Sequence, residues 1–159
     1  MCSRLKSEFP ILSNRIMAVV HKTVLLSYSA AQMFALVDKV EDYPAFLPWC
    51  GGVVVKERGP DRLVAAISIN YRGVKQSFTT ENINNPPTSM QMKLVEGPFK
   101  QLDGQWNFKV LREDACKIEF ALHYEFSSKI LEKLIGPVFG VIANSFVESF
   151  CKRAEEVYG

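Results

Sequence analysis

Residues 127–159 have the sequence SSKILEKLIGPVFGVIANSFVESFCKRAEEVYG, in which apolar side chains recur at steps of three and four positions. This spacing predicts one long amphipathic helix with an apolar stripe along one side. The stripe consists of Leu131, Leu134, Ile135, Val138, Phe139, Ile142, Phe146, Val147, Phe150, Ala154 and Val157. Because the stripe is rich in Phe and longer than a small core needs, we expect part of it to line a pocket for an apolar ligand. A kink or a break is expected at Gly136 and Pro137, because proline lacks a backbone donor.

The segments before this helix alternate between apolar and polar residues, which is typical of antiparallel strands with one buried face. Residues 19–26 are the first expected strand, and Ser29 is expected to cap a helix over residues 30–40. Further strands are expected at residues 53–57, 63–71, 74–83, 90–96, 101–111 and 116–126. This order predicts an α+β domain in which an antiparallel sheet curls around the terminal helix and encloses an internal hydrophobic cavity.

The composition is that of an ordinary globular protein of 159 residues. A formal charge of +2 does not indicate a nucleic-acid partner, and no DNA binding is expected. No apolar run approaches the roughly 20 residues of a membrane-spanning helix, and no secretion signal is recognisable, so we expect a cytoplasmic protein. The four cysteines lack the spacing of metal ligands, and they predict buried thiols rather than a disulfide framework or a metal site.

Residues 1–16 show neither strand alternation nor an amphipathic stripe. We therefore expect them to be a disordered extension that lies outside a domain spanning residues 17–159. Met17 directly precedes the first strand, so the extension is either a true N-terminal tail or the product of a misplaced start codon.

Residues 43–50, YPAFLPWC, place three aromatic residues and two prolines in a short segment between a helix and a strand. Such a stiff, apolar segment suits the rim of a cavity, although it also suits a rigid plug over the end of the core. The candidate cavity residues from this segment are Tyr43, Phe46, Leu47 and Trp49.

A second group of candidates follows the bend at Gly97 and Pro98, which is expected to direct Phe99 toward the helix or the cavity. Leu102 and Trp106 share one face of the next strand. Taken singly, each of these residues is equally suited to plain core packing. As a group, the predicted cavity wall consists of Phe99, Leu102 and Trp106 with Phe139, Ile142 and Phe146 of the terminal helix.

No catalytic residue is predicted, because acid–base chemistry needs titratable groups that converge in a pocket. His21 and His123 fall on the polar faces of their strands. Tyr71 and Tyr124 point inward, but a buried tyrosine usually only satisfies its hydroxyl.

Three motifs in this order resemble the bacterial RatA-type ribosome-association toxins, which belong with the coenzyme Q-binding proteins of the START-like superfamily. They are YPAFLPWC at residues 43–50, GPFKQLDGQW at residues 97–106 and RAEEVYG at residues 153–159. The resemblance covers residues 18–159. It implies a helix-grip fold with a hydrophobic tunnel and no known catalytic residues.

The resemblance also implies two activities, which are binding of ubiquinone in support of cellular respiration and binding of the large ribosomal subunit to block subunit association. We expect a non-enzymatic protein that binds ubiquinone or a related polyprenyl lipid, makes a transient membrane contact and needs no other cofactor. The ribosome-binding toxin is the alternative, and a cyclase-like enzyme is a second one because polyketide cyclases share this fold. The basic residues available for a ribosome contact are Arg58, Arg62, Arg72, Lys75, Lys93, Lys109, Arg112 and Lys117.

Overall fold

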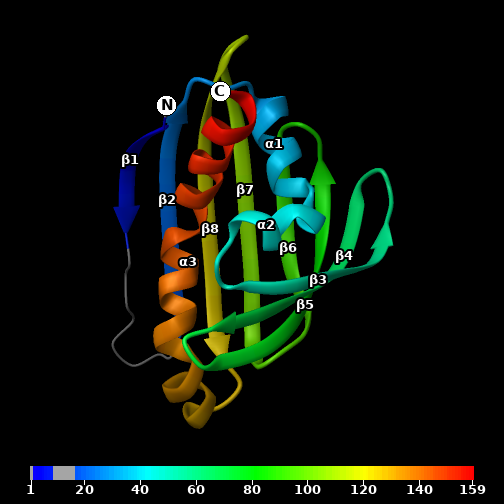
Figure 1. The fold of residues 1–159 in the computed structure, drawn as a ribbon, viewed down its shortest axis with the longest axis vertical. Coiled ribbons are helices and arrows are strands. Elements are labelled where there is room, and N and C mark those ends of the chain that lie inside the picture. Colours follow the sequence, from blue (N-terminus) through cyan, green and yellow to red (C-terminus); the bar gives the residue numbers. More distant parts are fainter. Residues whose placement is uncertain (1, 9–16) are drawn as a thin grey trace.

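The computed structural model describes residues 2–8 and 17–159, in which an antiparallel sheet of eight strands packs around a long helix (Figure 1). The strand order in the sheet is β1-β2-β8-β7-β6-β5-β4-β3. The elements are β1 (Cys2–Glu8), β2 (Ala18–Leu26), α1 (Ala30–Asp38), a 3-10 turn (Val40–Asp42), α2 (Tyr43–Phe46), β3 (Cys50–Arg58), β4 (Arg62–Tyr71), β5 (Val74–Asn85), β6 (Ser89–Glu96), β7 (Phe99–Arg112), β8 (Ala115–Phe126) and α3 (Lys129–Tyr158). The predicted α+β architecture is confirmed.

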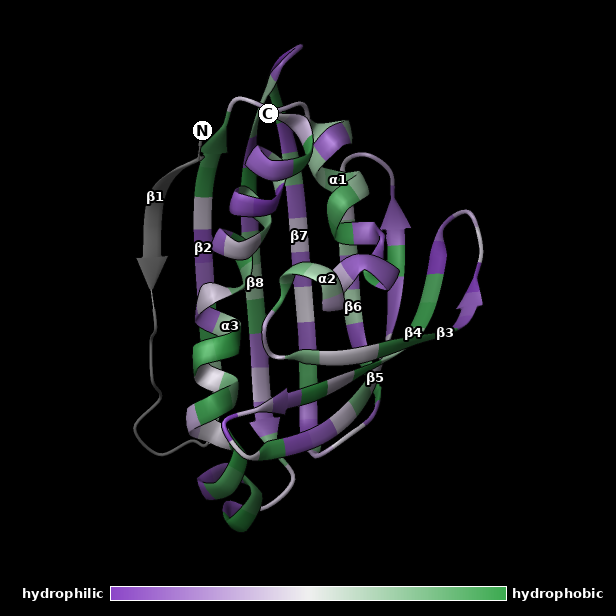
Figure 2. Ribbon diagram, viewed as in Figure 1, coloured by the Kyte–Doolittle hydropathy of each residue, from purple (hydrophilic) through white to green (hydrophobic). Residues whose placement is uncertain are grey.

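The sheet is strongly curved, and this curvature creates the space between the sheet and α3. Figure 1 shows α3 lying along β2, β8 and β7, while β3, β4 and β5 cross below α2 at a steep angle to those strands. Register shifts interrupt the β7–β8 ladder near both of its ends, and such irregularities bend a strand. Apolar residues recur along β7, β8 and α3 in Figure 2, as expected for elements with one buried side.

Helix α3 is capped by Ser128, whose side chain accepts a hydrogen bond from the backbone N–H of Leu131 at 3.1 Å. The helix continues through Pro137, so the predicted break does not occur. Its buried residues are Ile135, Phe139, Ile142, Ala143, Val147, Phe150, Cys151 and Ala154. In the described part of the chain, α3 is the one helix that could span a membrane by length and composition, and it is here the central helix of a folded core.

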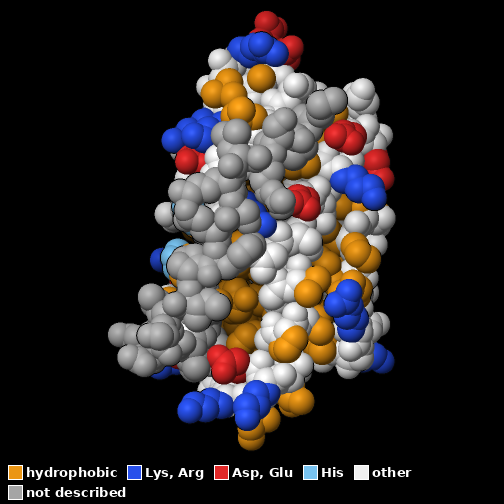
Figure 3. Space-filling model, turned by 90° about the vertical axis from the view of Figure 1, so that its left-hand side faces the viewer, with side chains coloured by type: hydrophobic (Ala, Val, Ile, Leu, Met, Phe, Trp, Pro, Cys, Tyr) orange, Lys and Arg blue, Asp and Glu red, His pale blue; other side chains and the backbone are white. Residues whose placement is uncertain are grey.

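Part of the predicted apolar stripe is not buried. Leu134 is 67% exposed and Val157 is 48% exposed, which corrects the prediction that both face the core. Leu134 lies seven positions before Val141, which is 41% exposed, so both residues are on the same, outward-facing side of α3. Ile135, in the same turn as Leu134, is only 2% exposed. Ile130 is also exposed at the start of α3, beside the exposed Lys129 and Lys133. At this lower end of the molecule, apolar and basic side chains lie together in Figure 3.

Helix α1 has the capping box expected for its N-terminus, because Ser29 and Gln32 each bond the other's backbone N–H. The helix ends at Asp38, two residues before the predicted end. The segment expected to be a loop after it contains the short helix α2, which tolerates Pro44 because an early helical position needs no N–H donor. The predicted strands all form, although most begin or end one to three residues from the expected positions.

Two expectations about the N-terminal segment and the cysteines need correction. Residues 2–8 were expected to lack structure, but they form β1, which pairs antiparallel with β2 through backbone hydrogen bonds. The rest of the predicted extension, residues 1 and 9–16, lies outside the described residues. Cys50 and Cys116 are buried free thiols, as predicted, whereas Cys151 is disulfide-bonded.

Candidate ligand-binding cavity

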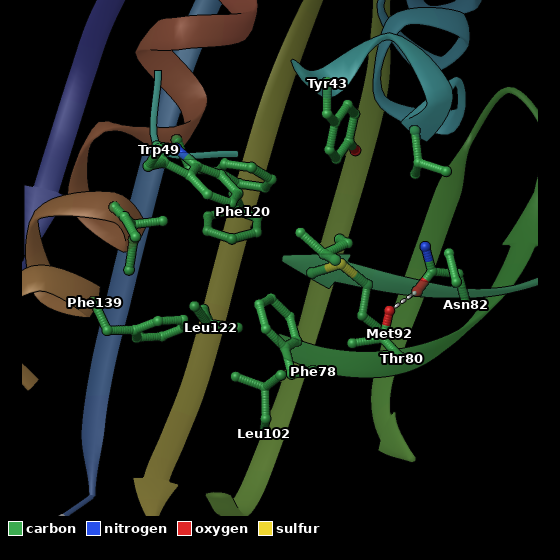
Figure 4. A pocket seen from close by; sticks show the side chains of 16 residues that line it. Tyr43, Trp49, Phe78, Thr80, Asn82, Met92, Leu102, Phe120, Leu122 and Phe139 are labelled. Carbon is green, nitrogen blue, oxygen red and sulfur yellow. Dashed lines mark hydrogen bonds between the residues drawn. The ribbon is translucent and has the colours of Figure 1, made fainter. Parts of the chain in front are cut away.

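A cavity of about 60 Å³ lies between α3 and the concave face of the sheet, beneath α2. Figure 4 shows side chains from the sheet, α2 and α3 converging on it. The lining residues are Val40, Tyr43, Trp49, Ala65, Ile67, Phe78, Thr80, Asn82, Met92, Leu102, Phe120, Leu122, Phe139, Ile142, Ala143 and Phe146. Most of this wall is aliphatic or aromatic, so the cavity is suited to an apolar ligand.

Simple periodicity explains which side chains reach the cavity from each element. On β5, Phe78, Thr80 and Asn82 are two positions apart, so all three project from the same face of the sheet. On α3, Phe139, Ile142 and Phe146 follow the three- and four-residue steps of one helical side. Strand alternation and helix periodicity therefore aim two rows of side chains at one space.

The structure brings together several of the residues that the sequence predicts for the cavity wall. Those that line it are Tyr43, Trp49, Leu102, Phe139, Ile142 and Phe146. Phe139 is packed between sheet residues, with ring centroids 4.8 Å from Tyr124 and 5.0 Å from Phe99. The wall thus contains residues from both of the aromatic motifs and from the terminal helix.

Phe46 and Leu47 do not line the cavity, contrary to the prediction. Phe46 packs on the outer side of α2, 5.4 Å from the Phe150 ring and under the Arg153 guanidinium. Leu47 is buried and its backbone N–H closes α2 by donating to the Tyr43 carbonyl. Because residues 43–46 form a helical turn, successive side chains point in different directions, and those of Tyr43 and Trp49 face inward.

Phe99 and Trp106 are also core residues outside the cavity wall, which corrects the prediction for both. Phe99 stacks on Phe126 at 5.0 Å, near the lower end of β7 and β8. Trp106 is fully buried and lies behind the wall, with its ring 4.6 Å from Phe120 and 5.7 Å from Phe146. Each therefore supports a residue that does line the cavity.

The remaining lining residues were missed by the sequence prediction. They are Val40, Ala65, Ile67, Phe78, Thr80, Asn82, Met92, Phe120, Leu122 and Ala143. The signal for part of this set was present, because alternation along β5 puts Thr80 and Asn82 on the face of Phe78. The curvature of the sheet determines which inward-facing side chains border the cavity. Strand alternation does not predict this curvature.

The polar groups of the wall are few and do not titrate near neutral pH. The Tyr43 hydroxyl donates to the Val37 carbonyl at 2.5 Å. Burial, reinforced by the Asp38 carboxylate, raises the pKa of Tyr43 well above its ordinary value, so its hydroxyl stays protonated. The Thr80 hydroxyl donates to the Asn82 carboxamide oxygen at 3.2 Å (Figure 4). These lining residues can orient a neutral ligand, but they supply no general base.

Gly104 on β7 gives Met92 room to lie in the cavity wall, directly opposite it on β6. A Cβ at this position would overlap the terminal methyl of Met92 and lie 3.3 Å from a Leu122 methyl. Gly104→Ala is therefore expected to push the flexible end of the Met92 side chain toward the cavity. The expected overpacking cost is about 1 kcal/mol, the low end of the usual range, and binding of an apolar dye such as Nile red is expected to weaken. Urea denaturation and dye titration measure both effects. Gly52→Ala, where a Cβ meets open space, is the control, and equal dye affinity in both variants would contradict the prediction.

Comparison with known protein families and sequences gives concordant results. Residues 26–151 match the family described as "Polyketide cyclase / dehydrase and lipid transport". The ribosome association toxin RatA of Vibrio cholerae is 44% identical over 143 residues, which cover 90% of this chain and 99% of that protein. The mitochondrial coenzyme Q-binding protein COQ10 of Dictyostelium discoideum is 26% identical, over 84% of this chain and 67% of that protein.

Solved structures with the same fold have low sequence identity to this chain. A START superfamily protein from Mycobacterium smegmatis has a TM-score of 0.73 at 19% identity and covers 87% of this chain and 98% of its own. The Zhui aromatase/cyclase from Streptomyces sp. R1128 has a TM-score of 0.75 at 15% identity and covers 90% of this chain and 96% of its own. The chain therefore has the START-like helix-grip fold and belongs to the polyketide cyclase, dehydrase and lipid transport family, and within it to the family of the protein named RatA.

Proposed function

We propose that the protein is a non-enzymatic carrier that binds ubiquinone, or a related polyprenyl lipid, in the cavity between α3 and the sheet. The observation that supports this most directly is the wall itself, which combines aromatic and aliphatic side chains with the neutral polar pair Thr80 and Asn82. Burial of an isoprenoid tail contributes about 25 cal/mol per Å², from which ordering costs are subtracted. The domain that performs this role is proposed to span residues 17–159.

The cavity must enlarge to admit such a ligand, because about 60 Å³ is well below the roughly 300–1,000 Å³ of pockets for drug-sized molecules. Met92 is the wall residue best suited to move, since it is only partly buried and its thioether side chain has several rotatable bonds. Displacement of this side chain enlarges the cavity above the paired strands β6 and β7 without breaking their backbone ladder.

The similarity to COQ10 supports the choice of a quinone over other lipids, since that relative is named for binding coenzyme Q. The chain would then support respiration by carrying quinone to or from membranes. We assign its transient membrane contact to the exposed start of α3, where Ile130 and Leu134 lie beside Lys129 and Lys133. Apolar side chains flanked by lysines suit a bilayer surface that carries anionic lipids.

A cyclase-like enzyme is a weaker reading of the same cavity. The likeness to the Zhui aromatase/cyclase extends to the fold, and fold alone does not determine activity. A cyclase needs groups that take up or release a proton near neutral pH. Tyr43 is held protonated, and the side chains of Asn82 and Thr80 do not ionise in this range.

Quinone binding is tested by mass spectrometry of lipid extracted from protein purified without detergent, together with titration by a short-chain ubiquinone. Retained quinone and quenching of tryptophan fluorescence are expected, because Trp49 lines the cavity and Trp106 contacts its wall. Protein that carries no lipid and shows no quenching at saturating quinone would contradict the proposed function.

Association with the large ribosomal subunit is the second candidate function, favoured by the 44% identity to a ribosome association toxin. The salt bridges of the sheet narrow the choice of contact residues. Arg58, Arg62, Lys109 and Arg112 each pair with an acidic side chain. Four of the candidates, Arg72, Lys75, Lys93 and Lys117, have no acidic partner within 4 Å in the described part of the chain. Of these, Arg72 and Lys75 lie together at the β4–β5 turn, and they are the proposed contact.

Sedimentation with purified large subunits tests this second function. Co-sedimentation that weakens as salt is raised is expected if Arg72 and Lys75 contact RNA phosphates, because neutralising them releases counterions. Binding in the cytoplasm would follow from a ribosomal partner. Sedimentation that is independent of salt, or absent, would contradict a contact through these basic residues.

A further inference from the structure

Thr80 and Asn82 form a polar pair in an otherwise apolar part of the cavity wall. Both lie on β5 two positions apart, and Figure 4 shows their side chains on the same side of the strand. Each residue is only 6% exposed. Threonine and asparagine are mostly surface residues, and a strand needs only apolar side chains on its inner face. This pair therefore calls for an explanation beyond packing.

The hydrogen bonds of the pair leave part of its capacity unused. The Thr80 hydroxyl donates to Asn82 Oδ1, which fixes the orientation of the carboxamide. Asn82 Nδ2 carries two N–H groups, and its partner in the described residues is the thioether sulfur of Met90 at 3.7 Å, a weak acceptor. One amide N–H is thus available to an acceptor atom brought by a ligand, and a buried donor gains stability when it finds one.

The charge of the wall limits what the ligand can be. No lysine, arginine, histidine or carboxylate is among the residues that line the cavity, and the Tyr43 hydroxyl is already bonded to Val37. A phosphate or carboxylate head would be buried here without a counter-charge, which is strongly unfavourable. A neutral ring that bears carbonyl oxygens meets the requirement, because the rings of Phe78 and Phe120 offer it apolar contacts and Asn82 offers it a donor.

Building on the proposed function, we propose that Thr80 and Asn82 form the head-group subsite of the cavity, in which Asn82 Nδ2 donates to a carbonyl oxygen of a neutral, quinone-class ring. Thr80 acts as a positioning residue. Its hydroxyl holds the carboxamide oxygen of Asn82, and this orients Asn82 Nδ2 away from Thr80. The apolar tail follows the helix side of the cavity, along Phe139 and Ile142.

The test compares a ligand that has the head with one that lacks it. Wild type, Asn82→Leu and Thr80→Val are titrated with decylubiquinone and with decane, and displacement of bound Nile red gives both dissociation constants. Each variant is expected to raise the dissociation constant for decylubiquinone about 3- to 10-fold, the value of one hydrogen bond, and to leave that for decane unchanged. Thr79→Val is the matched control, since Thr79 is buried on the same strand but does not line the cavity.

The outcomes separate this proposal from the proposed function. Unchanged decylubiquinone binding in folded Asn82→Leu and Thr80→Val protein would overturn the subsite and leave the carrier function intact. An equal loss for decane would also overturn it, because the pair would then only support the wall. A wild-type protein that binds neither ligand would refute the carrier function and the subsite together. If Asn82→Leu does not fold, Thr80→Val, which preserves the side-chain shape, decides the result.

Discussion

Replacing Phe139 by Asp is expected to lower the free energy of unfolding by about 4 kcal/mol or more. Phe139 is 3% exposed, and its ring contacts those of Phe99 and Tyr124. Loss of a buried Phe side chain alone costs about 3–5 kcal/mol, and an unpaired carboxylate in the same place adds a desolvation penalty. Total stabilities are about 5–15 kcal/mol, so the variant is expected to be partly unfolded at 37 °C. Urea denaturation followed by circular dichroism measures the effect.

Lys133→Ala on the same helix is the control for this experiment. Lys133 is exposed, and a surface substitution of this kind usually changes stability by less than about 0.5 kcal/mol. Phe139→Leu separates the two causes, because it removes the ring but adds no charge. Equal unfolding free energies for Phe139→Asp and Lys133→Ala would mean that the buried side of α3 has been assigned wrongly.

Periodicity predicted those features of the fold and the cavity that depend on which way a side chain points. The three-and-four spacing of α3 identified Phe139, Ile142 and Phe146 as one inward row, and they all line the cavity. The same spacing put Leu134 at the edge of the apolar stripe, and it could not show whether the sheet reaches far enough to cover that edge. Burial at the edge of a helical stripe is a property of the tertiary structure.

The features that the sequence did not predict depend on how far a side chain lies from the cavity and on backbone pairing between strands. Trp106 and Phe120 pair across β7 and β8 and both face inward, yet Phe120 borders the cavity and Trp106 lies behind it. Alternation assigns both residues to the same face of the sheet. It cannot predict which of them is nearer to the cavity, because that distance follows from sheet curvature. Strand β1 was missed for another reason, since an edge strand is held by backbone hydrogen bonds that require no apolar alternation.

Replacing Ile142 by Trp is expected to abolish quinone binding, with at least a tenfold rise in the dissociation constant, while the protein stays folded. Ile142 lines the cavity from α3 and is 4% exposed, so a larger side chain must occupy the ligand's space. Overpacking costs about 1–3 kcal/mol, which a domain of ordinary stability tolerates. Quenching by a short-chain ubiquinone measures binding, and thermal unfolding checks the fold. Val141→Trp is the matched control. Val141 is next to Ile142 in the sequence, but its side chain is 41% exposed and points away from the cavity.

The same Ile142→Trp variant distinguishes one functional surface from two. Association with large ribosomal subunits is expected to be unchanged, because Arg72 and Lys75 flank a turn that contributes no residue to the cavity wall. Loss of both activities in a folded protein would mean that the ribosome contact runs through the cavity or depends on a bound lipid. Loss of neither would mean that the cavity between α3 and the sheet is not the ligand site. If the protein binds quinone and the ribosome through two independent surfaces, Ile142→Trp removes quinone binding and leaves co-sedimentation with the large subunit unchanged.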